Sequence, residues 1–185
     1  MSLMSRSPAT VAVPALLCSL LAACSGMRPM SSGSPANVPA AIAVPSGNTP
    51  VFTLKGSGLL NYECRAKADA PGTFDWALAS PDAVLKDKND ALVGKYYGGP
   101  TWEHADGSKI TGKQLAIAPA PTPGNIPWQL VQAAPTSGAG TMSGITYVQR
   151  INTMAGVAPA EPCTAATAAS KKQVRYSADY VFYKG

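Results

Sequence analysis

Residues 174–183 read VRYSADYVFY and form the most regular pattern in the chain. Apolar and aromatic side chains recur there at every second position, and they are Val174, Tyr176, Ala178, Tyr180 and Phe182. The positions between them are Arg175, Ser177, Asp179, Val181 and Tyr183. Because successive side chains of a β-strand point to opposite faces, the segment is predicted to be a strand that rests one face on a hydrophobic core.

Similar alternation predicts strands along much of the chain, notably over residues 60–67 and 145–152. In the second of these the expected inward side chains are Ile145, Tyr147, Gln149 and Ile151, and the expected outward ones are Thr146, Val148, Arg150 and Asn152. Polar tips at residues 87–90 and 105–108 predict two hairpins. Turns are expected at residues 80–82 and 138–140, and a proline-rich loop at residues 119–127.

These elements predict an all-β fold, mainly an antiparallel β-sandwich or barrel. The one expected helix is short and covers residues 164–172, which are rich in alanine. Trp76 and Trp128 fall on expected strands and are assigned to the core. The segment Gly56-Ser57-Gly58 runs into a strand rather than a helix, so it is interpreted as a turn and not as a dinucleotide site.

The N-terminus predicts export. Residues 1–23 contain Arg6, an apolar run and small residues before Cys24, as a signal peptide does. Leu21-Ala22-Ala23-Cys24 resembles the lipobox of bacterial lipoproteins, which implies acylation of Cys24 and a stable membrane anchor. We therefore expect a lipidated cysteine and flexible tether over residues 24–37 and a single β domain over residues 38–185. The expected location is the cell envelope, with Ser25 favouring the outer membrane; the alternative is an ordinary secretory signal and a soluble secreted protein.

The four cysteines fit this location. Cys18 leaves with the signal peptide and Cys24 takes the lipid, so Cys64 and Cys163 remain. A pair of cysteines in an exported chain predicts a disulfide, and two buried free thiols are the alternative.

Charge excludes one class of partner. The chain has 15 basic and 10 acidic residues, and Lys171-Lys172 is the one adjacent basic pair, so no basic stripe is available for nucleic acid. The mild positive balance suits acidic surface polymers or anionic headgroups, and it is equally explained by solubility.

Two sets of side chains around residues 96–106 are candidates for function. Tyr96, Tyr97, Trp102, Glu103 and Asp106 would form an aromatic and polar platform for a sugar, although a core position for Trp102 is equally favoured. His104, the one histidine, would serve instead as a base with Glu103 and Asp106 in a hydrolase or weak metal site. Two features oppose the second reading: no Gly-x-Ser-x-Gly elbow occurs, and neighbours on a strand point to opposite faces.

The mature chain resembles the secreted bacterial and fungal family known as domain of unknown function 3455. The matching stretches are Asn61-Tyr62-Glu63-Cys64, Gly99-Pro100-Thr101-Trp102-Glu103, Asp106-Gly107-Ser108, Ile126-Pro127-Trp128, Arg150-Ile151-Asn152-Thr153, Pro162-Cys163 and residues 176–183. The resemblance supports export and the disulfide and implies no activity. Bacterial members often carry His where this chain has Tyr96, which argues against a histidine-based site here.

The sequence thus predicts a non-enzymatic envelope lipoprotein that binds or organises something at the cell surface, with an envelope polysaccharide as the candidate ligand. The alternative is a secreted hydrolase or metal-dependent enzyme using His104. We expect no cofactor, no metal, no dinucleotide and no nucleic acid partner.

Overall fold

The structure is a computed structural model that describes residues 37–136 and 139–185. The expected signal peptide, Cys24 and the tether up to residue 36 lie outside the described residues. Within these described ranges, no helix is both long enough and apolar enough to cross a membrane.

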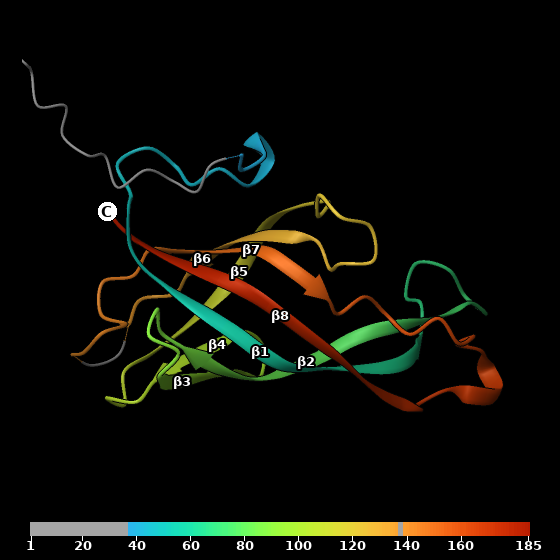
Figure 1. Ribbon diagram of the computed structural model, residues 1–185. Helices are drawn as coiled ribbons and strands as arrows, with labels where there is room; N and C mark the ends of the chain where they lie inside the picture. The colour runs from blue at the N-terminus through green and yellow to red at the C-terminus, as the bar shows by residue number, and fades with distance from the viewer. Residues whose placement is uncertain (1–36, 137–138) are drawn as a thin grey trace, which may run out of the picture. The chain divides into compact units, whose positions relative to one another are not determined.

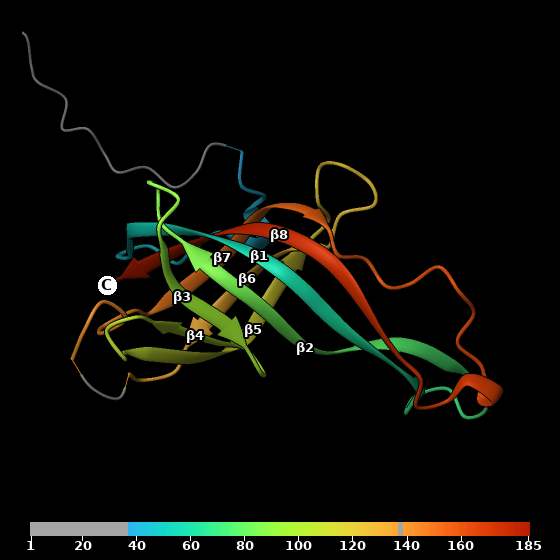
Figure 2. The same cartoon turned by 60° about the horizontal axis from the view of Figure 1, so that its bottom comes forward.

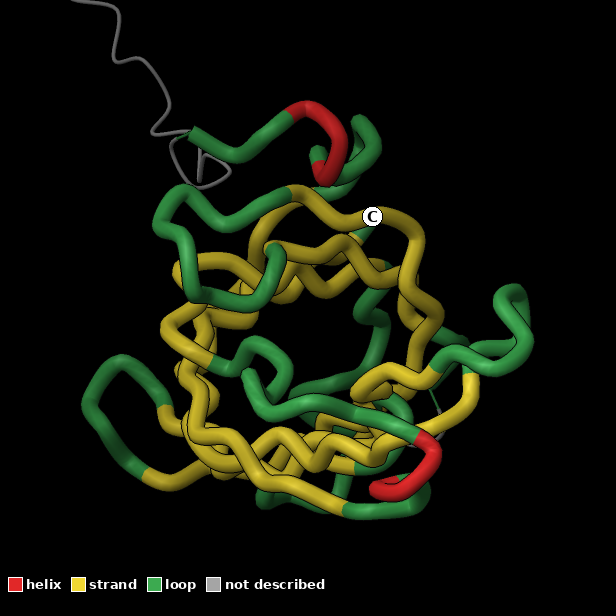
Figure 3. The backbone as a smooth tube through the Cα atoms, turned by 90° about the vertical axis from the view of Figure 1, so that its right-hand side faces the viewer, coloured by secondary structure: helices red, strands yellow, loops and turns green. Residues whose placement is uncertain are grey.

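The described residues form a closed antiparallel barrel of eight strands, which settles the choice between sandwich and barrel. The strands are β1 (Thr49–Ala66), β2 (Phe74–Lys86), β3 (Leu92–Tyr97), β4 (Thr101–His104), β5 (Lys109–Ala118), β6 (Trp128–Ala133), β7 (Tyr147–Ala155) and β8 (Lys171–Lys184). Each strand pairs with its neighbour in sequence, and β1 pairs with β8 to close the ring. Figure 1 shows β1 and β8 side by side, and Figure 3 shows the strands around a common interior.

The barrel interior holds the larger of two hydrophobic clusters. Every strand contributes a buried side chain to it, for example Leu54, Leu85, Tyr96, Trp102, Ile110, Val131, Val148 and Tyr180. The expected inward face of β8 is confirmed, because its members from Tyr176 to Phe182 are at most 4% exposed. The core position of Trp76 is also confirmed.

A second cluster lies on the outer face of the sheet, under the segment of residues 38–44. This segment contains the 3₁₀ turn η1 (Ala40–Ile42), and its fully buried Ile42 packs with Trp128, Ile151 and Tyr183. Gln149 fixes the segment by donating a hydrogen bond from Nε2 to the Ile42 carbonyl (2.8 Å). Trp128 is buried as expected, but on this outer face.

Because residues 38–44 cover the outer face of the sheet, the inward and outward faces of β7 are the opposite of those expected. Tyr147 and Ile151 pack in the outer cluster, while Val148 belongs to the interior. Since side chains alternate, Arg150 lies on the interior face with Val148. The prediction that Arg150 faces outward is therefore wrong, because the apolar face of this strand is buried under residues 38–44 rather than inside the barrel.

One end of the sheet is a three-stranded extension. Beyond Asn61 of β1, β2 and β8 pair with β1 alone, and Figure 2 shows these three strands running past the others. The predicted disulfide is confirmed here: Cys64 is bonded to Cys163, with 5.5 Å between their Cα atoms. It ties β1 to the loop that precedes β8.

The helix expected over residues 164–172 is wrong. The structure has only the 3₁₀ turn η2 (Ala165–Thr167), closed by a capping box between Thr164 and Thr167, and β8 already begins at Lys171. The chain leaves the turn because the Ala169 amide and the Ser170 carbonyl bond to the backbone of Cys64. Pairing with β1 thus outweighs the helix propensity of the alanines.

Two expected turns are also corrected, while the expected hairpin tips after β2 and β4 are confirmed. Gly56-Ser57-Gly58 lies inside β1, where a side chain at position 56 would meet the ring of Tyr180 at 2.5 Å. Pro81 lies inside β2, opposite Leu60 of β1. Proline is tolerated there because β3 pairs with β2 only from Asp82 onward, so one edge of β2 has no partner at Pro81.

The short β3–β4 hairpin leaves a break in the barrel wall. The pairing of β3 with β2 ends where Tyr97 faces Asp82. The pairing of β4 with β5 ends where Thr101 faces Thr111. Residues 74–81 of β2 therefore pair with β1 alone, and residues 112–118 of β5 pair with β6 alone. No described strand lies between these two edges.

Candidate functional site

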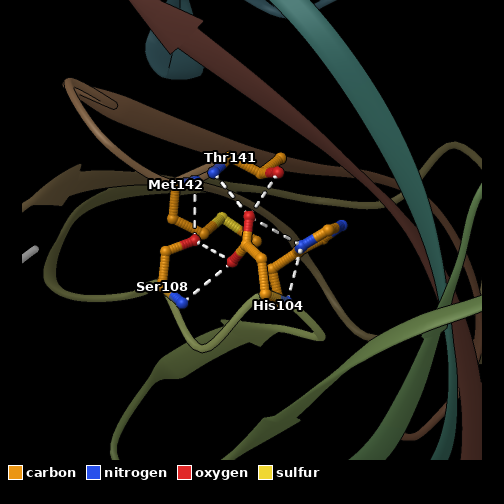
Figure 4. Close-up of polar contacts among 5 residues, drawn as sticks. His104, Ser108, Thr141 and Met142 are labelled. Atoms are coloured by element: carbon orange, nitrogen blue, oxygen red, sulfur yellow. Dashed lines mark hydrogen bonds and ion pairs between the residues drawn. The ribbon is translucent and has the colours of Figure 1, made fainter. Parts of the chain in front are cut away.

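The Asp106 carboxylate anchors the turn between β4 and β5 (Figure 4). Its Oδ1 accepts hydrogen bonds from the Ser108 hydroxyl (2.5 Å) and amide (2.9 Å), and its Oδ2 accepts from the Thr141 hydroxyl (2.7 Å) and amide (2.8 Å). These donors, led by the Ser108 hydroxyl, hold the pKa of Asp106 well below its ordinary value because they stabilise the charged form. The carboxylate thus ties the turn to the loop that precedes β7.

His104 and Ser108 do not form a nucleophile and base pair. Nδ1 of His104 lies 3.1 Å from Oδ2 of Asp106. The buried Ser108 hydroxyl instead donates to Asp106 and accepts from the Met142 amide (3.1 Å), as Figure 4 shows. A nucleophilic serine requires a bond to its base, so this cluster has the geometry of a structural turn.

Glu103 bonds to Tyr97 and Lys95. Its Oε2 accepts a hydrogen bond from the Tyr97 hydroxyl (2.5 Å), and its Oε1 lies 3.4 Å from Lys95 Nζ. The Tyr97 bond lowers the pKa of Glu103 and raises that of Tyr97, because it stabilises the carboxylate together with the protonated phenol. Within residues 37–136 and 139–185, no three His, Cys, Asp or Glu side chains are grouped to hold a metal ion.

Tyr96 and Trp102 do not form an exposed platform. Their rings stack on each other with centroids 4.7 Å apart, and Trp102 is 0% exposed. Trp102 also packs edge-on against Tyr180 and Phe182 inside the barrel. Of the two positions left open for Trp102, the structure therefore gives the core, where large aromatic side chains of a strand usually pack. Tyr97 remains half-buried.

A polar pocket occupies the break in the barrel wall instead. It is lined by residues 78–81 of β2 and 98–100 of the β3–β4 turn, and Tyr96 forms part of its lining. Three polar side chains from the adjoining strands complete it, and these are Gln114, Gln129 and Arg150. Its volume is about 230 Å³, below the roughly 300 to 1,000 Å³ of typical ligand pockets. The pocket suits a small group or one end of a longer ligand.

Arg150 is the unusual member of this pocket. It is 8% exposed, and the one hydrogen bond that its guanidinium makes with the described residues runs from Nη2 to the Pro127 carbonyl (2.9 Å). Its Nε is buried and has no partner in the structure. None of the ion pairs among the described residues includes it. A buried charge normally has a counter-charge, and here the described residues supply none within ion-pair distance.

Tyrosine hydroxyls near Arg150 do not supply that counter-charge. Burial raises the pKa of Tyr62, Tyr96 and Tyr180, and the Arg150 charge opposes the rise in each case. Tyr176 shares a hydrogen bond of 3.1 Å between hydroxyls with Tyr180, and burial also raises its pKa. These phenols stay neutral at neutral pH, so none of them gives the guanidinium a negative partner.

Arg150, Gln114 and Gln129 were missed by the reading of the sequence. A charged residue in an alternating strand is ordinarily assigned to solvent. Nothing in the sequence of β7 itself indicates that residues 38–44 bury its outer face. One signal was present, because Arg150 opens one of the stretches that carry the family resemblance.

Fold and pocket together define a disulfide-linked, eight-stranded antiparallel barrel with a polar pocket in its wall. The chain belongs to the family described as Protein of unknown function (DUF3455), whose model matches residues 45–184. No curated protein and no solved structure matches the chain.

Proposed function

We propose that this protein is a non-enzymatic binding module of the cell envelope, and that the polar pocket takes one unit of an envelope polysaccharide. The lipid on Cys24 holds the barrel at the membrane, in keeping with the sequence of residues 1–24. The family supplies no activity of its own, so the proposal depends on the pocket.

The observation that carries the proposal is the set of uncommitted polar groups in the pocket. Gln129 donates from Nε2 to Oε1 of Gln114 (2.5 Å). No other described residue bonds to the remaining amide groups, so Gln129 offers a carbonyl and Gln114 an NH₂ group. A donor and an acceptor side by side match a sugar hydroxyl, which both gives and accepts a hydrogen bond. Tyr96 adds an aromatic wall.

Binding is a better account than catalysis for these residues. The lining includes no carboxylate, histidine or cysteine, and the lining serine, Ser80, bonds to the Asn61 amide. The histidine that a hydrolase would use lies in the structural cluster of Asp106.

The test blocks the pocket without touching the core. Gly99 lines the pocket and has no positive φ, and a Cβ there meets nothing within 4 Å, so the backbone accepts the side chain of Gly99→Trp. The full-length protein should bind polysaccharide extracted from the cells that produce it, and Gly99→Trp should weaken this binding at least tenfold. Ala68→Trp, on an exposed loop, is the matched control. Equal binding by the two variants, or none by the wild type, contradicts the proposal.

A further inference from the structure

The position of Arg150 indicates the charge of the ligand. Arg150 is directly opposed to Gln129 on β6 and to Tyr180 on β8, so one row across three strands carries an amide, a guanidinium and a phenol. Directly opposed residues place their Cβ atoms roughly 4.5 to 5.5 Å apart. The Arg150 guanidinium therefore lies among neutral side chains that form hydrogen bonds. Its side chain is part of the pocket lining.

Burying this cation without a counter-charge destabilises the barrel, and no internal contact explains its presence. Its hydrogen bond to Pro127 uses one of five N–H donors. The buried Nε remains without a partner. Asp82, whose charge reaches Tyr176, forms no ion pair with Arg150. An anionic group from outside the described residues would supply the counter-charge that these contacts do not.

We propose that the pocket recognises a carboxylated sugar, with the carboxylate on the Arg150 guanidinium and neighbouring hydroxyls on Gln114 and Gln129. This inference rests on the proposed function, whose site it shares. The planar guanidinium presents a fork of donors that matches a carboxylate. The amides of Gln114 and Gln129 match hydroxyls. An acidic sugar carries both kinds of group on one small ring, which suits a pocket of about 230 Å³.

The experiment compares an oligogalacturonate with its methyl ester, which keeps the sugar and removes the charge. Binding of each to the full-length protein is measured by titration calorimetry. The wild type should prefer the free acid at least tenfold. Arg150→Met should lose this preference, and Arg150→Lys should retain part of it because a lysine keeps the charge and lacks the fork. Arg175→Met, on an exposed position of β8, should behave as the wild type.

The possible failures are distinguishable. Equal affinity for the acid and the ester, with both weakened by Gly99→Trp, contradicts the preference for a carboxylated sugar. It leaves the proposed polysaccharide-binding function in place. A preference for the acid that survives in Arg150→Met also overturns the inference. Inorganic phosphate that displaces the oligogalacturonate at equal concentration shows a general anion site and overturns the assignment to a carboxylated sugar. Binding of neither probe nor envelope polysaccharide overturns both proposals.

Discussion

Gln129 of β6 and Arg150 of β7 lie directly opposite each other in the barrel. The residue facing the buried guanidinium is thus a neutral amide, where a protein built for stability alone would place a carboxylate or an apolar pair. Residues that serve binding are often kept at a cost in stability.

Arg150→Met should therefore stabilise the protein in the absence of ligand. The substitution removes an unpaired buried charge and retains an apolar chain of similar length, and we expect the free energy of unfolding to rise by about 1 kcal/mol. Urea denaturation of the full-length protein measures it. Arg175→Met, at an exposed position, should change the same quantity by less than about 0.5 kcal/mol. A large loss of stability in Arg150→Met would mean that the bond to Pro127 outweighs the charge.

Trp102→Ala should destabilise the barrel rather than affect binding alone. Trp102 is fully buried and contacts three aromatic rings, so its removal leaves a cavity that we expect to cost about 3 to 5 kcal/mol. Thermal melting followed by near-ultraviolet circular dichroism reports the loss. The control is Leu92→Ala, because Leu92 is 65% exposed. An unchanged melting temperature of Trp102→Ala would contradict the buried position of Trp102.

The disulfide should be a main contributor to stability. Replacing Cys64 and Cys163 by alanine frees a loop with a sequence separation of 99 residues, and we expect a loss of about 2 to 5 kcal/mol. The midpoint of urea unfolding measures the loss. Wild-type protein unfolded under a strong reductant should show the same urea midpoint as the double variant. A higher midpoint for the reduced wild type would mean that the alanine side chains, and not the lost disulfide, cause the loss of stability.

The alternating pattern assigned the faces of β8 correctly and those of β7 wrongly, although β8 also buries part of its outer face, at Val181 and Tyr183. In β8 the pattern from Val174 to Phe182 assigned the interior face correctly, because tyrosine and phenylalanine stand against Arg175 and Asp179. In β7 residues 38–44 bury the opposite face, so the apolar pattern pointed away from the interior and Arg150 was placed in solvent. Such long-range cover cannot be recognised from local periodicity.

Turn chemistry failed for a related reason. Pro81 and the Gly56-Ser57-Gly58 segment have the composition of turns, but ladder partners on β1, β2 and β8 hold them extended. The break in the wall beside Pro81 arises from the shortness of the β3–β4 hairpin. The pocket is thus a property of strand lengths, and its lining residues are scattered through the sequence.

Asp106→Asn should make the stability of the folded protein less dependent on pH in the acidic range. The folded pKa of Asp106 is depressed below its ordinary value of 3.8, so its contribution is fully present above that pH and is lost as the pH falls toward the folded pKa. We expect the variant to be less stable than the wild type at pH 7, and the difference between them to shrink below about pH 4. Urea midpoints measured from pH 7 down to pH 2.5 test this. A difference that stays constant across the series would assign the effect to lost hydrogen-bond geometry rather than to the carboxylate charge.

Acylation of Cys24 is the prediction on which the envelope location depends. Protein purified from the membranes of its own cells should have the mass of a chain that begins at Cys24, increased by a diacylglyceryl group and an acyl chain. The same sample should gain two hydrogens on reduction, from the bond between Cys64 and Cys163. Cys24→Ala is the matched variant, and it should leave the membrane fraction while keeping the disulfide. An unacylated wild type in the soluble fraction would remove the anchor and favour the alternative of a soluble secreted protein.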